Sequence, residues 1–223
     1  MTWLVVERPG VKLYKPHYQN FRRVIDVITS LIFSLLLTPL FFIIALAVKI
    51  DSKGPILFVQ ERVGKGGRRF KMYKFRTMHI NIDRHSHQAF MKAFINGKVV
   101  TNGEKTVFKP FESTQVTRMG RLLRKTSLDE LPQLINILKG EMSLIGPRPN
   151  VPWEVEEYRT IHQERLEVLP GITGLAQVRG RSGITFDEIV RYDIEYVEKQ
   201  SIALDMKILW WTFISVVYGK GAE

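Results

Sequence analysis

The 223-residue sequence contains no cysteine, and this absence excludes several kinds of protein. Without thiols there is no disulfide framework, no thiolate metal site and no cysteine nucleophile. A chain of this composition is compatible with a reducing cytoplasm. Internal repeats and low-complexity segments are also absent, and residues 51–223 have the composition of a globular domain. The length fits one compact domain together with its terminal segments.

Acidic residues are scarce relative to basic ones, with 22 Asp and Glu against 33 Lys and Arg. The formal net charge is therefore +11 at pH 7. Such an excess indicates an anionic partner, because a positively charged surface attracts phosphorylated substrates, anionic lipids and nucleic acids. The composition leaves these three partner classes open, but it disfavours a soluble enzyme for neutral substrates.

The sequence has one long uncharged hydrophobic run, Val27 to Val48, VITSLIFSLLLTPLFFIIALAV. Its length suits a membrane helix, which needs about 20 apolar residues. Its late start and charged C-terminal flank argue against a cleaved signal peptide. Two features argue against a simple span: Pro39 follows Thr38 near the middle, and basic residues flank both ends, namely Arg22, Arg23, Lys49 and Lys53. A re-entrant hairpin and a spanning helix with a proline kink therefore stay open as alternatives.

The segment from Pro55 to Met78, PILFVQERVGKGGRRFKMYKFRTM, predicts a β-hairpin, because strand-forming residues flank a glycine-rich turn. The second strand is strongly basic. Lys74 and Arg76 are two residues apart, so we expect both on one face of the strand. This basic face is either a solvated sheet edge or a surface that binds phosphates or lipid headgroups. Residues 79–116 are polar and mixed, and we expect them to form a surface insertion.

The C-terminal segment LDMKILWWTFISVVYGKG is apolar and rich in aromatic residues. Trp and Tyr favour the interface between membrane and water, so this segment is a candidate interfacial helix. The alternative is a helix that packs on the core of the domain.

The adjacent carboxylates Asp129 and Glu130 lie between basic residues and an apolar helical segment, in LLRKTSLDELPQLINILKG. Ser127 and Glu130 have the spacing of a capping box, which would make the pair structural. That assignment places Pro132 inside the helix, whereas a later start makes Asp129 the cap. Alternatively, two carboxylates beside a phosphate site can hold Mg²⁺, and one can attack phosphorus to form an acyl phosphate. The residue pattern leaves both interpretations open.

Four blocks occur in this order along the chain: a proline-broken hydrophobic segment, YKFRTM, SLDELPQLINILKGEMSLIGPRP and LPGITGLAQVRGR. Together they resemble the bacterial sugar transferase family, the monotopic polyprenyl-phosphate phosphoglycosyl transferases, over residues 20–218. The resemblance implies an α+β, mainly helical fold, in which a small catalytic domain contains the β-hairpin. It also implies a re-entrant membrane helix over residues 20–50, broken at Thr38-Pro39, and interfacial amphipathic helices. Residues 1–19 then form a lead, and residues 51–223 form the cytosolic domain with its insertion at about 79–116.

The resemblance implies transfer of a sugar 1-phosphate from a UDP-sugar to undecaprenyl phosphate, with release of UMP. This reaction initiates exopolysaccharide, capsule or O-antigen assembly at the cytoplasmic face of the bacterial inner membrane. Galactose or glucose is the leading sugar, and an N-acetylated or deoxy-amino sugar is the alternative. The implied nucleophile is Asp129, which forms a covalent phosphosugar intermediate, while Glu130 assists as a base or by holding Mg²⁺ with Asp129. The implied phosphate-binding residues are Lys74, Arg76, Arg124, Arg148 and Arg181.

Three hypotheses of different classes are open to test. A membrane enzyme requires Asp129, so Asp129→Asn should abolish turnover and leave membrane association intact. A non-enzymatic basic membrane-associated module would tolerate loss of the acidic pair and depend on the charge of its loops. Nucleic-acid binding agrees with the net charge, but the apolar anchor and the lack of a known nucleic-acid motif argue against it. The expected partners are a UDP-sugar, undecaprenyl phosphate and membrane lipid, with no nucleic acid; a homo-oligomer stays open.

Overall fold

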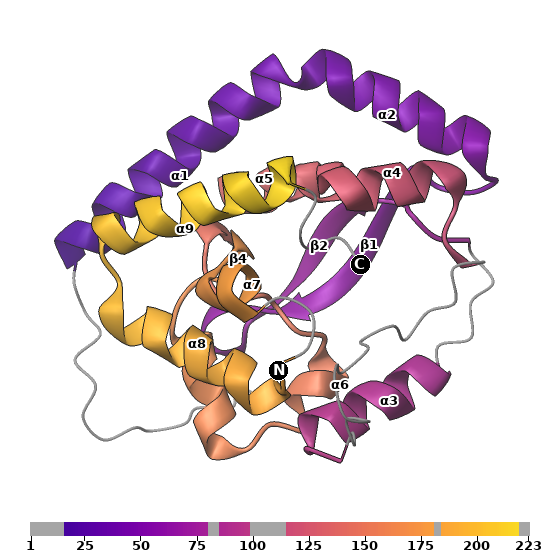
Figure 1. Cartoon of the computed structure of the whole chain (residues 1–223). Helices are drawn as coiled ribbons and strands as arrows, with labels where there is room; N and C mark the ends of the chain where they lie inside the picture. The colour runs from indigo at the N-terminus through magenta and orange to yellow at the C-terminus, as the bar shows by residue number, and fades with distance from the viewer. Residues whose placement is uncertain (1–15, 80–84, 99–114, 181–183, 219–223) are drawn as a thin grey trace.

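The computed structural model describes residues 16–79, 85–98, 115–180 and 184–218. This part of the chain is mainly helical, as the resemblance implies, and it contains two small two-stranded sheets (Figure 1). The helices are α1 (Pro16–Leu36), α2 (Thr38–Asp51), α3 (His85–Ile95), α4 (Arg118–Thr126), α5 (Leu134–Leu138), α6 (Pro152–Val155), α7 (Leu175–Gly180), α8 (Phe186–Lys199) and α9 (Ile202–Val217). The strands are β1 (Leu57–Val63), β2 (Arg69–Phe75), β3 (Ser143–Ile145) and β4 (Gly171–Thr173). Short 3-10 segments are η1 (Lys65–Gly67), η3 (Leu128–Gln133) and η4 (Thr160–Glu167).

The hydrophobic run forms a bent helix pair, with 64° between α1 and α2. Helix α2 places Pro39 in its first turn, where a missing N–H costs no internal hydrogen bond. The Thr38 hydroxyl donates to the Ser34 carbonyl at 2.7 Å and so satisfies an acceptor near the end of α1. Among the described residues, no single helix has the length and apolar composition to cross a bilayer, but this pair meets that test together. Helix α1 extends back to Pro16, so residues 16–19, which were expected in the lead, are helical.

Helix α1 is fastened to the domain near its N-terminus, and many of its apolar side chains are exposed. Arg22 donates to the Ser143 hydroxyl in β3 at 2.6 Å, and Arg23 donates to the Ile137 carbonyl in α5 at 2.6 Å. The exposed apolar residues of the two helices are Phe21, Val24, Ile25, Ile28, Leu31, Ile32, Phe33, Leu35, Leu36, Phe42, Ile43, Leu46 and Ile50. A contiguous apolar surface of this extent is typical of a membrane or protein interface. Figure 1 shows the helix pair as an arch over α9, α5 and α4.

Strands β1 and β2 form an antiparallel hairpin, as the sequence predicts, with Leu57 opposite Phe75. In the turn, Gly66 and Gly67 have positive φ values of 64° and 78°, which glycine adopts without strain. Buried side chains of β2, including Met72, pack against α5. This packing brings the end of β2 beside η3 and hence beside the acidic pair.

Strands β3 and β4 form a short parallel pair that the sequence analysis did not predict, with Ser143 opposite Gly171. A Cβ atom on Gly146, directly after β3, would lie 2.3 Å from the Leu169 carbonyl oxygen. Only glycine permits this close approach. The contact holds the loop that follows β3, which carries Arg148, against the segment that leads into β4.

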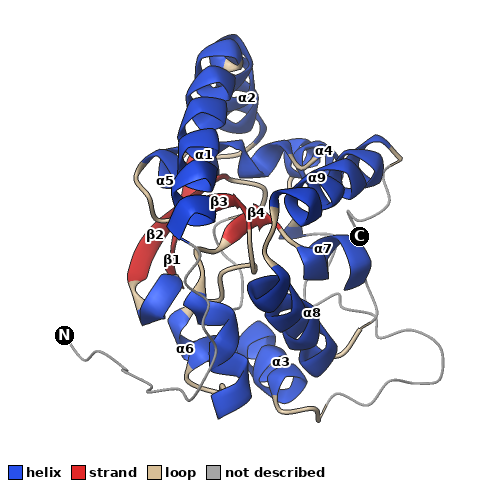
Figure 2. Ribbon diagram, turned by 90° about the vertical axis from the view of Figure 1, so that its left-hand side faces the viewer, coloured by secondary structure: helices blue, strands red, loops and turns tan. Residues whose placement is uncertain are grey.

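The main core lies around β3 and β4, which Figure 2 shows between α5 on one side and α7 and α9 on the other. Its buried residues are Ile145, Val168, Leu175, Val178, Tyr196, Val197 and Ile208. Helix α9 contributes Ile208 to this core but exposes Met206, Trp210 and Phe213. The C-terminal segment therefore packs on the core with one face, and its opposite face has the exposed apolar character expected of an interfacial helix.

The range 79–116 is not only a polar surface insertion, because α3 contributes to a second core. Met91, Phe94 and Ile95 are buried against Phe186 and Val190 of α8. Their i, i+3, i+4 spacing is a helical signal, but it is short and lies in a polar context, which hid it in the sequence analysis. The rest of this range includes residues 80–84 and 99–114, which lie outside the described residues.

Candidate active site

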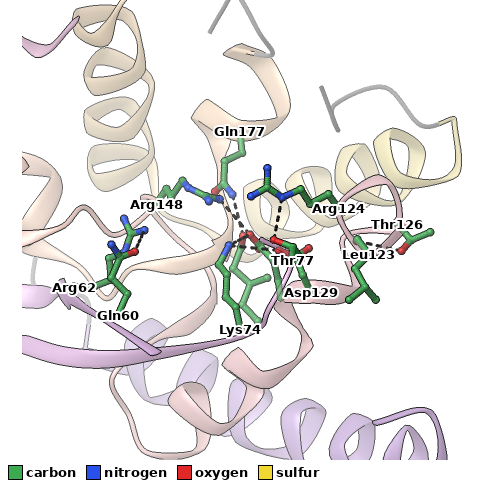
Figure 3. Close-up of polar contacts among 12 residues, drawn as sticks. Gln60, Arg62, Lys74, Thr77, Leu123, Arg124, Thr126, Asp129, Arg148 and Gln177 are labelled. Carbon is green, nitrogen blue, oxygen red and sulfur yellow. Dashed lines mark hydrogen bonds and ion pairs between the residues drawn. The ribbon is translucent and has the colours of Figure 1, made fainter. Parts of the chain in front are cut away.

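Charged side chains from four segments of the chain meet in one place (Figure 3). Lys74 lies near the end of β2, Arg124 near the end of α4, and Asp129 and Glu130 in η3, while Arg148 follows β3. Lys74 approaches both carboxylates, and Arg148 approaches Glu130. We call these five residues the site cluster. The structure thus brings together five of the seven residues that the sequence analysis assigned to catalysis or phosphate binding.

The two carboxylates of the site cluster have different surroundings. Lys74 Nζ donates to Glu130 Oε1 at 2.5 Å, and Arg148 Nη1 donates to the same oxygen at 3.3 Å. Lys74 Nζ is 4.0 Å from Asp129 Oδ2. Asp129 is 9% exposed, so its charge has little contact with solvent. Glu130 is therefore held by two direct ion pairs, whereas the one ion pair of Asp129 among the described residues is distant.

These surroundings shift the pKa values of the two carboxyl groups in opposite directions. Burial raises the pKa of Asp129 above its ordinary value, against the attraction of Lys74. Burial also opposes ionisation of Glu130, but Lys74 and Arg148 outweigh it and lower the pKa of Glu130 to about 2. Burial lowers the pKa of the Lys74 ammonium, against the attraction of Glu130. Glu130 is thus a firmly ionised partner, and Asp129 is the member of the pair whose charge is less stabilised.

Neither carboxylate is a helix cap, so the capping-box interpretation is wrong. Ser127 has a left-handed backbone with φ of 57°, and it ends α4. Its side chain makes no capping hydrogen bond to η3, which follows. The Glu130 N–H bonds to the Ser127 carbonyl at 3.2 Å as part of a 3-10 turn. Asp129 and Pro132 both lie inside η3. The side chains of Asp129 and Glu130 therefore do not cap a helix, and they take part in the ion pairs of the site cluster.

The site cluster has more cations than carboxylates, and one of its cations, Arg148, is half exposed to solvent. Arg124 Nε donates to the buried hydroxyl of Thr77 at 3.0 Å, which fixes the guanidinium near Asp129. The Arg148 side chain is 50% exposed. Three cations face two carboxylates, so the cluster favours an additional anion at the exposed side. Guanidinium groups are well suited to bind phosphate oxygens in pairs.

One predicted phosphate-binding residue, Arg76, is not part of this cluster. The Arg76 guanidinium is buried and donates to the Ser52 carbonyl at 2.6 Å and to its hydroxyl at 2.8 Å. Ser52 follows the C-terminal end of α2, where unpaired carbonyls favour a cation. Arg76 therefore caps the bent helix pair, and its expected role at a phosphate is not supported by the geometry. Arg181 lies outside the described residues.

The sequence analysis missed two neutral residues at this site, Thr77 and Gln177. Gln177 in α7 donates from Nε2 to the Ile172 carbonyl at 2.9 Å, and Figure 3 shows it beside Arg148. Its Oε1 atom is buried without a hydrogen-bond partner among the residues that the structure describes. Both residues lie in motifs already singled out, YKFRTM and LPGITGLAQVRGR. A search for charged residues could not find them, because a hydroxyl and an amide add no charge.

The residues present fit a magnesium ion that is completed by a phosphate ligand. Within the described ranges, no group of three or more His, Asp or Glu side chains is arranged around a common metal position. Mg²⁺ is commonly held by one or two carboxylates, with substrate phosphates and water as the other ligands. Asp129 and Glu130 provide that pair, and the weakly compensated charge of Asp129 favours a nearby cation.

A carboxylate pair inside a cluster of Lys and Arg side chains is typical of a protein that binds phosphorylated ligands. The comparison with protein families identifies which one. The sequence model described as "Bacterial sugar transferase" matches residues 17–219, so the chain belongs to the bacterial sugar transferase family.

Curated relatives agree with this assignment. The chain is 39% identical over 217 residues to the galactosyl transferase CpsE of Streptococcus agalactiae serotype III (strain NEM316). The aligned region covers 96% of this chain and 46% of that protein. It is 38% identical over 210 residues to a UDP-glucose:undecaprenyl-phosphate glucose-1-phosphate transferase of Klebsiella pneumoniae, covering 91% of this chain and 41% of the relative. A protein of the same name from Caulobacter vibrioides (strain ATCC 19089 / CIP 103742 / CB 15) is 38% identical over 224 residues, covering 97% and 77%. The chain thus spans less than half the length of the first two relatives.

Proposed function

We propose that this protein transfers a sugar 1-phosphate from a UDP-sugar to undecaprenyl phosphate, releases UMP, and thereby initiates glycan assembly. The observation that carries the proposal is the unequal environment of the two carboxylates. Glu130 is tied to Lys74 and Arg148, whereas Asp129 is buried with a raised pKa. A poorly stabilised carboxylate is a stronger nucleophile than a solvated one, as covalent catalysis requires.

The proposed reaction has two displacements at the same phosphorus atom. An Asp129 oxygen attacks the sugar-bearing phosphorus of the donor, and the bond from that phosphorus to the bridging oxygen breaks. UMP leaves with the bonding electrons, and an aspartyl phosphosugar remains. An oxygen of undecaprenyl phosphate then attacks this phosphorus, breaks the bond to Asp129 and regenerates the free carboxylate. The product is undecaprenyl diphosphate carrying the sugar.

The other members of the site cluster would neutralise the phosphates during both displacements. Phosphoryl transfer depends more on positioning and charge neutralisation than on acid–base groups. Arg148 is the most exposed of the cations and is placed to bind the donor diphosphate first. Lys74 and Arg124 lie deeper, on either side of Asp129. Mg²⁺ is the proposed cofactor: Asp129 and Glu130 would hold it, and it would supply charge stabilisation to the leaving phosphate.

We further propose that the bent helix pair enters the cytoplasmic leaflet of the bacterial inner membrane and returns to the same side. The exposed apolar side chains of α1, α2 and α9 support this placement. Basic residues at both ends of the run also support it, because cytoplasmic flanks are enriched in Lys and Arg. Tags at the two termini should both be accessible from the cytoplasmic side alone. An N-terminal tag on the opposite side would contradict the hairpin and favour the spanning alternative.

The test is release of UMP by the membrane-embedded protein, supplied with Mg²⁺, undecaprenyl phosphate and a panel of UDP-sugars. The names of the relatives include galactosyl and glucose-1-phosphate transferases, so UDP-galactose and UDP-glucose are tried first. Release from one donor, lost on chelation and in Asp129→Asn, is the expected result. Asp187→Asn is the matched control, because Asp187 is an exposed aspartate paired with Arg159 away from the site cluster.

Each departure from this result has a distinct meaning. Release that persists in Asp129→Asn would remove the proposed nucleophile and keep the reaction. No release from any UDP-sugar by a folded, membrane-bound protein would overturn the proposed reaction and favour the non-enzymatic basic module. Transfer of radiolabelled sugar phosphate to the protein in the absence of undecaprenyl phosphate tests the covalent intermediate directly.

A further inference from the structure

The loop that presents Arg148 has four consecutive backbone carbonyls, and each accepts a hydrogen bond from outside the loop. The Pro147 carbonyl accepts from the Gly171 N–H at 3.0 Å, and the Asn150 carbonyl accepts from the Val63 N–H at 2.9 Å. The two carbonyls between them, of Arg148 and Pro149, are held by arginine side chains rather than by backbone. A loop with two prolines has few N–H groups of its own, so its fixed shape depends on these external donors.

Arg165 in η4 is the first of these arginines, and it contacts the loop at two points. Its Nη2 donates to the Arg148 carbonyl at 3.1 Å, and its Nη1 donates to Asn150 Oδ1 at 3.1 Å and to the Tyr158 hydroxyl at 2.8 Å. Asp193 of α8 lies behind the guanidinium, with Oδ2 at 2.6 Å from Nη2. Both side chains of this ion pair are 2% exposed. The forked guanidinium therefore links α8 to two positions of the Arg148 loop, Arg148 and Asn150.

Arg62 in β1 is the second arginine and supports the same loop from the hairpin. Its Nη1 donates to the Pro149 carbonyl at 2.9 Å. Burial lowers the pKa of Arg62 to about 10, and repulsion from Arg148 adds to this effect, against the attraction of Glu154. The cost of burying the Arg62 charge close to another cation is consistent with a demand for a particular loop geometry.

We propose that Arg165, backed by Asp193, is a positioning residue that holds the Arg148 guanidinium at the phosphate side of the site cluster. Buried ion pairs contribute little net stability compared with apolar residues, so the benefit of this one is expected in geometry. Small errors in the placement of a phosphate-binding group reduce catalysis strongly. This inference rests on the proposed function, because it takes Arg148 as a ligand of the donor diphosphate.

The experiment is a double-mutant cycle on kcat/KM for the UDP-sugar, measured with the full chain in membranes. Arg165→Lys keeps the charge but loses the fork that reaches both loop positions. We expect Arg165→Lys to reduce kcat/KM about tenfold or more when Arg148 is present, and less than about threefold in the Arg148→Ala background. Asp193→Asn should show the same dependence on Arg148, because it acts through Arg165. Equal losses in both backgrounds would show a general structural role and overturn the proposal.

Two further variants keep the test decisive. Arg159→Lys is the matched control: Arg159 also pairs with an aspartate of α8, Asp187, but it is exposed and does not touch the loop. It should leave kcat/KM within about twofold of the unmodified protein. If Arg165→Lys does not fold, as judged by thermal unfolding, Asn150→Ala replaces it, since this change removes only one Arg165 contact with the loop. Full additivity of Asn150→Ala with Arg148→Ala would then overturn the proposal.

The same assay separates this inference from the proposed function. An unmodified protein that releases no UMP contradicts the proposed function whatever the variants do. An active unmodified protein whose Arg165→Lys loss does not depend on Arg148 contradicts only the positioning role.

Discussion

Two groups of charged side chains lie on either side of the Arg148 loop, and they differ in how completely their charges are matched. In the site cluster three cations surround two carboxylates, and the Arg148 side chain is half exposed. On the other side a second group, which we call the buried cluster, consists of Arg62, Glu154, Arg165 and Asp193. The Arg165–Asp193 pair at its centre is almost inaccessible to solvent. One group includes a half-exposed cation, and the centre of the other is closed to solvent.

The comparison shows that burial alone does not mark a reactive carboxylate. Burial raises the pKa of Asp193 to about 6, and it also raises the pKa of Asp129. Asp193 faces a guanidinium at 2.6 Å with no access for a substrate, whereas the nearest ammonium to Asp129 is at 4.0 Å in a cluster with an exposed side. Under the proposed function, unmatched charge and solvent access together distinguish the reactive site cluster from the group that positions its loop.

The largest expected effect that tests this difference is that of Asp129→Asn. It should reduce turnover by about a thousandfold or more, because the attacking oxygen is lost. The raised pKa of Asp129 means that its contribution to folding stability is lost as pH rises through its native value. At neutral pH Asp129→Asn should therefore leave the unfolding temperature unchanged or raised. A large loss of stability would contradict the assignment of Asp129 to the open cluster.

Arg148→Ala is expected to have the next largest effect, about a hundredfold loss of kcat/KM for the UDP-sugar, because one phosphate contact disappears. Glu130 keeps its pair with Lys74 at 2.5 Å, so the protein should remain folded. Arg148→Lys should recover part of the lost activity, because lysine keeps the positive charge but cannot make the two-point contact of a guanidinium with a phosphate. Kinetics in membranes with saturating undecaprenyl phosphate measure both variants. Activity unchanged in Arg148→Ala would place the donor elsewhere.

The dependence of the first displacement on pH sharpens the contrast between Asp129 and Glu130. Below the pKa of Asp129 the nucleophile is protonated, and the rate should fall about tenfold for each pH unit. Because burial raises this pKa, the fall should begin above the ordinary value of 3.8. Glu130, with a pKa of about 2, stays ionised over the same range. Single-turnover UMP release measured against pH tests this, and a midpoint at or below 3.8 would contradict the raised pKa.

The smallest expected effect on catalysis is that of Arg76→Gln, which distinguishes Arg76 from its neighbour Lys74. Loss of the buried guanidinium leaves the Ser52 carbonyl unpaired and should cost about 1–3 kcal/mol of unfolding free energy. Turnover per folded molecule should change less than about threefold, because Arg76 does not face the acidic pair. Lys74→Gln should instead reduce turnover strongly, because it removes the ammonium that lies beside both carboxylates. Thermal unfolding and UMP release, measured on both variants, decide between a structural and a phosphate-binding Arg76.

Local patterns in the sequence were sufficient for several features of this protein. Thr38 and Pro39 break the hydrophobic run because proline cannot extend the helix that precedes it. The glycine-rich turn specifies a hairpin, and Gly140 closes α5 with φ of 79°. The adjacent carboxylates were recognisable as a candidate site because their capping role conflicted with Pro132. Each of these inferences depends on residues that are close together in the chain.

Tertiary structure decided what depends on residues far apart in the chain. Lys74 and Arg76 have the same charge and nearly the same place in the sequence, but one meets η3 and the other meets the end of α2. The capping box between Ser127 and Glu130 failed because Lys74 and Arg148 bind the Glu130 carboxylate instead. The sequence by itself determined which side chains were available and where the chain turns. Only packing decided which charges meet, because the strength of an ion pair depends on distance and burial rather than on position in the sequence.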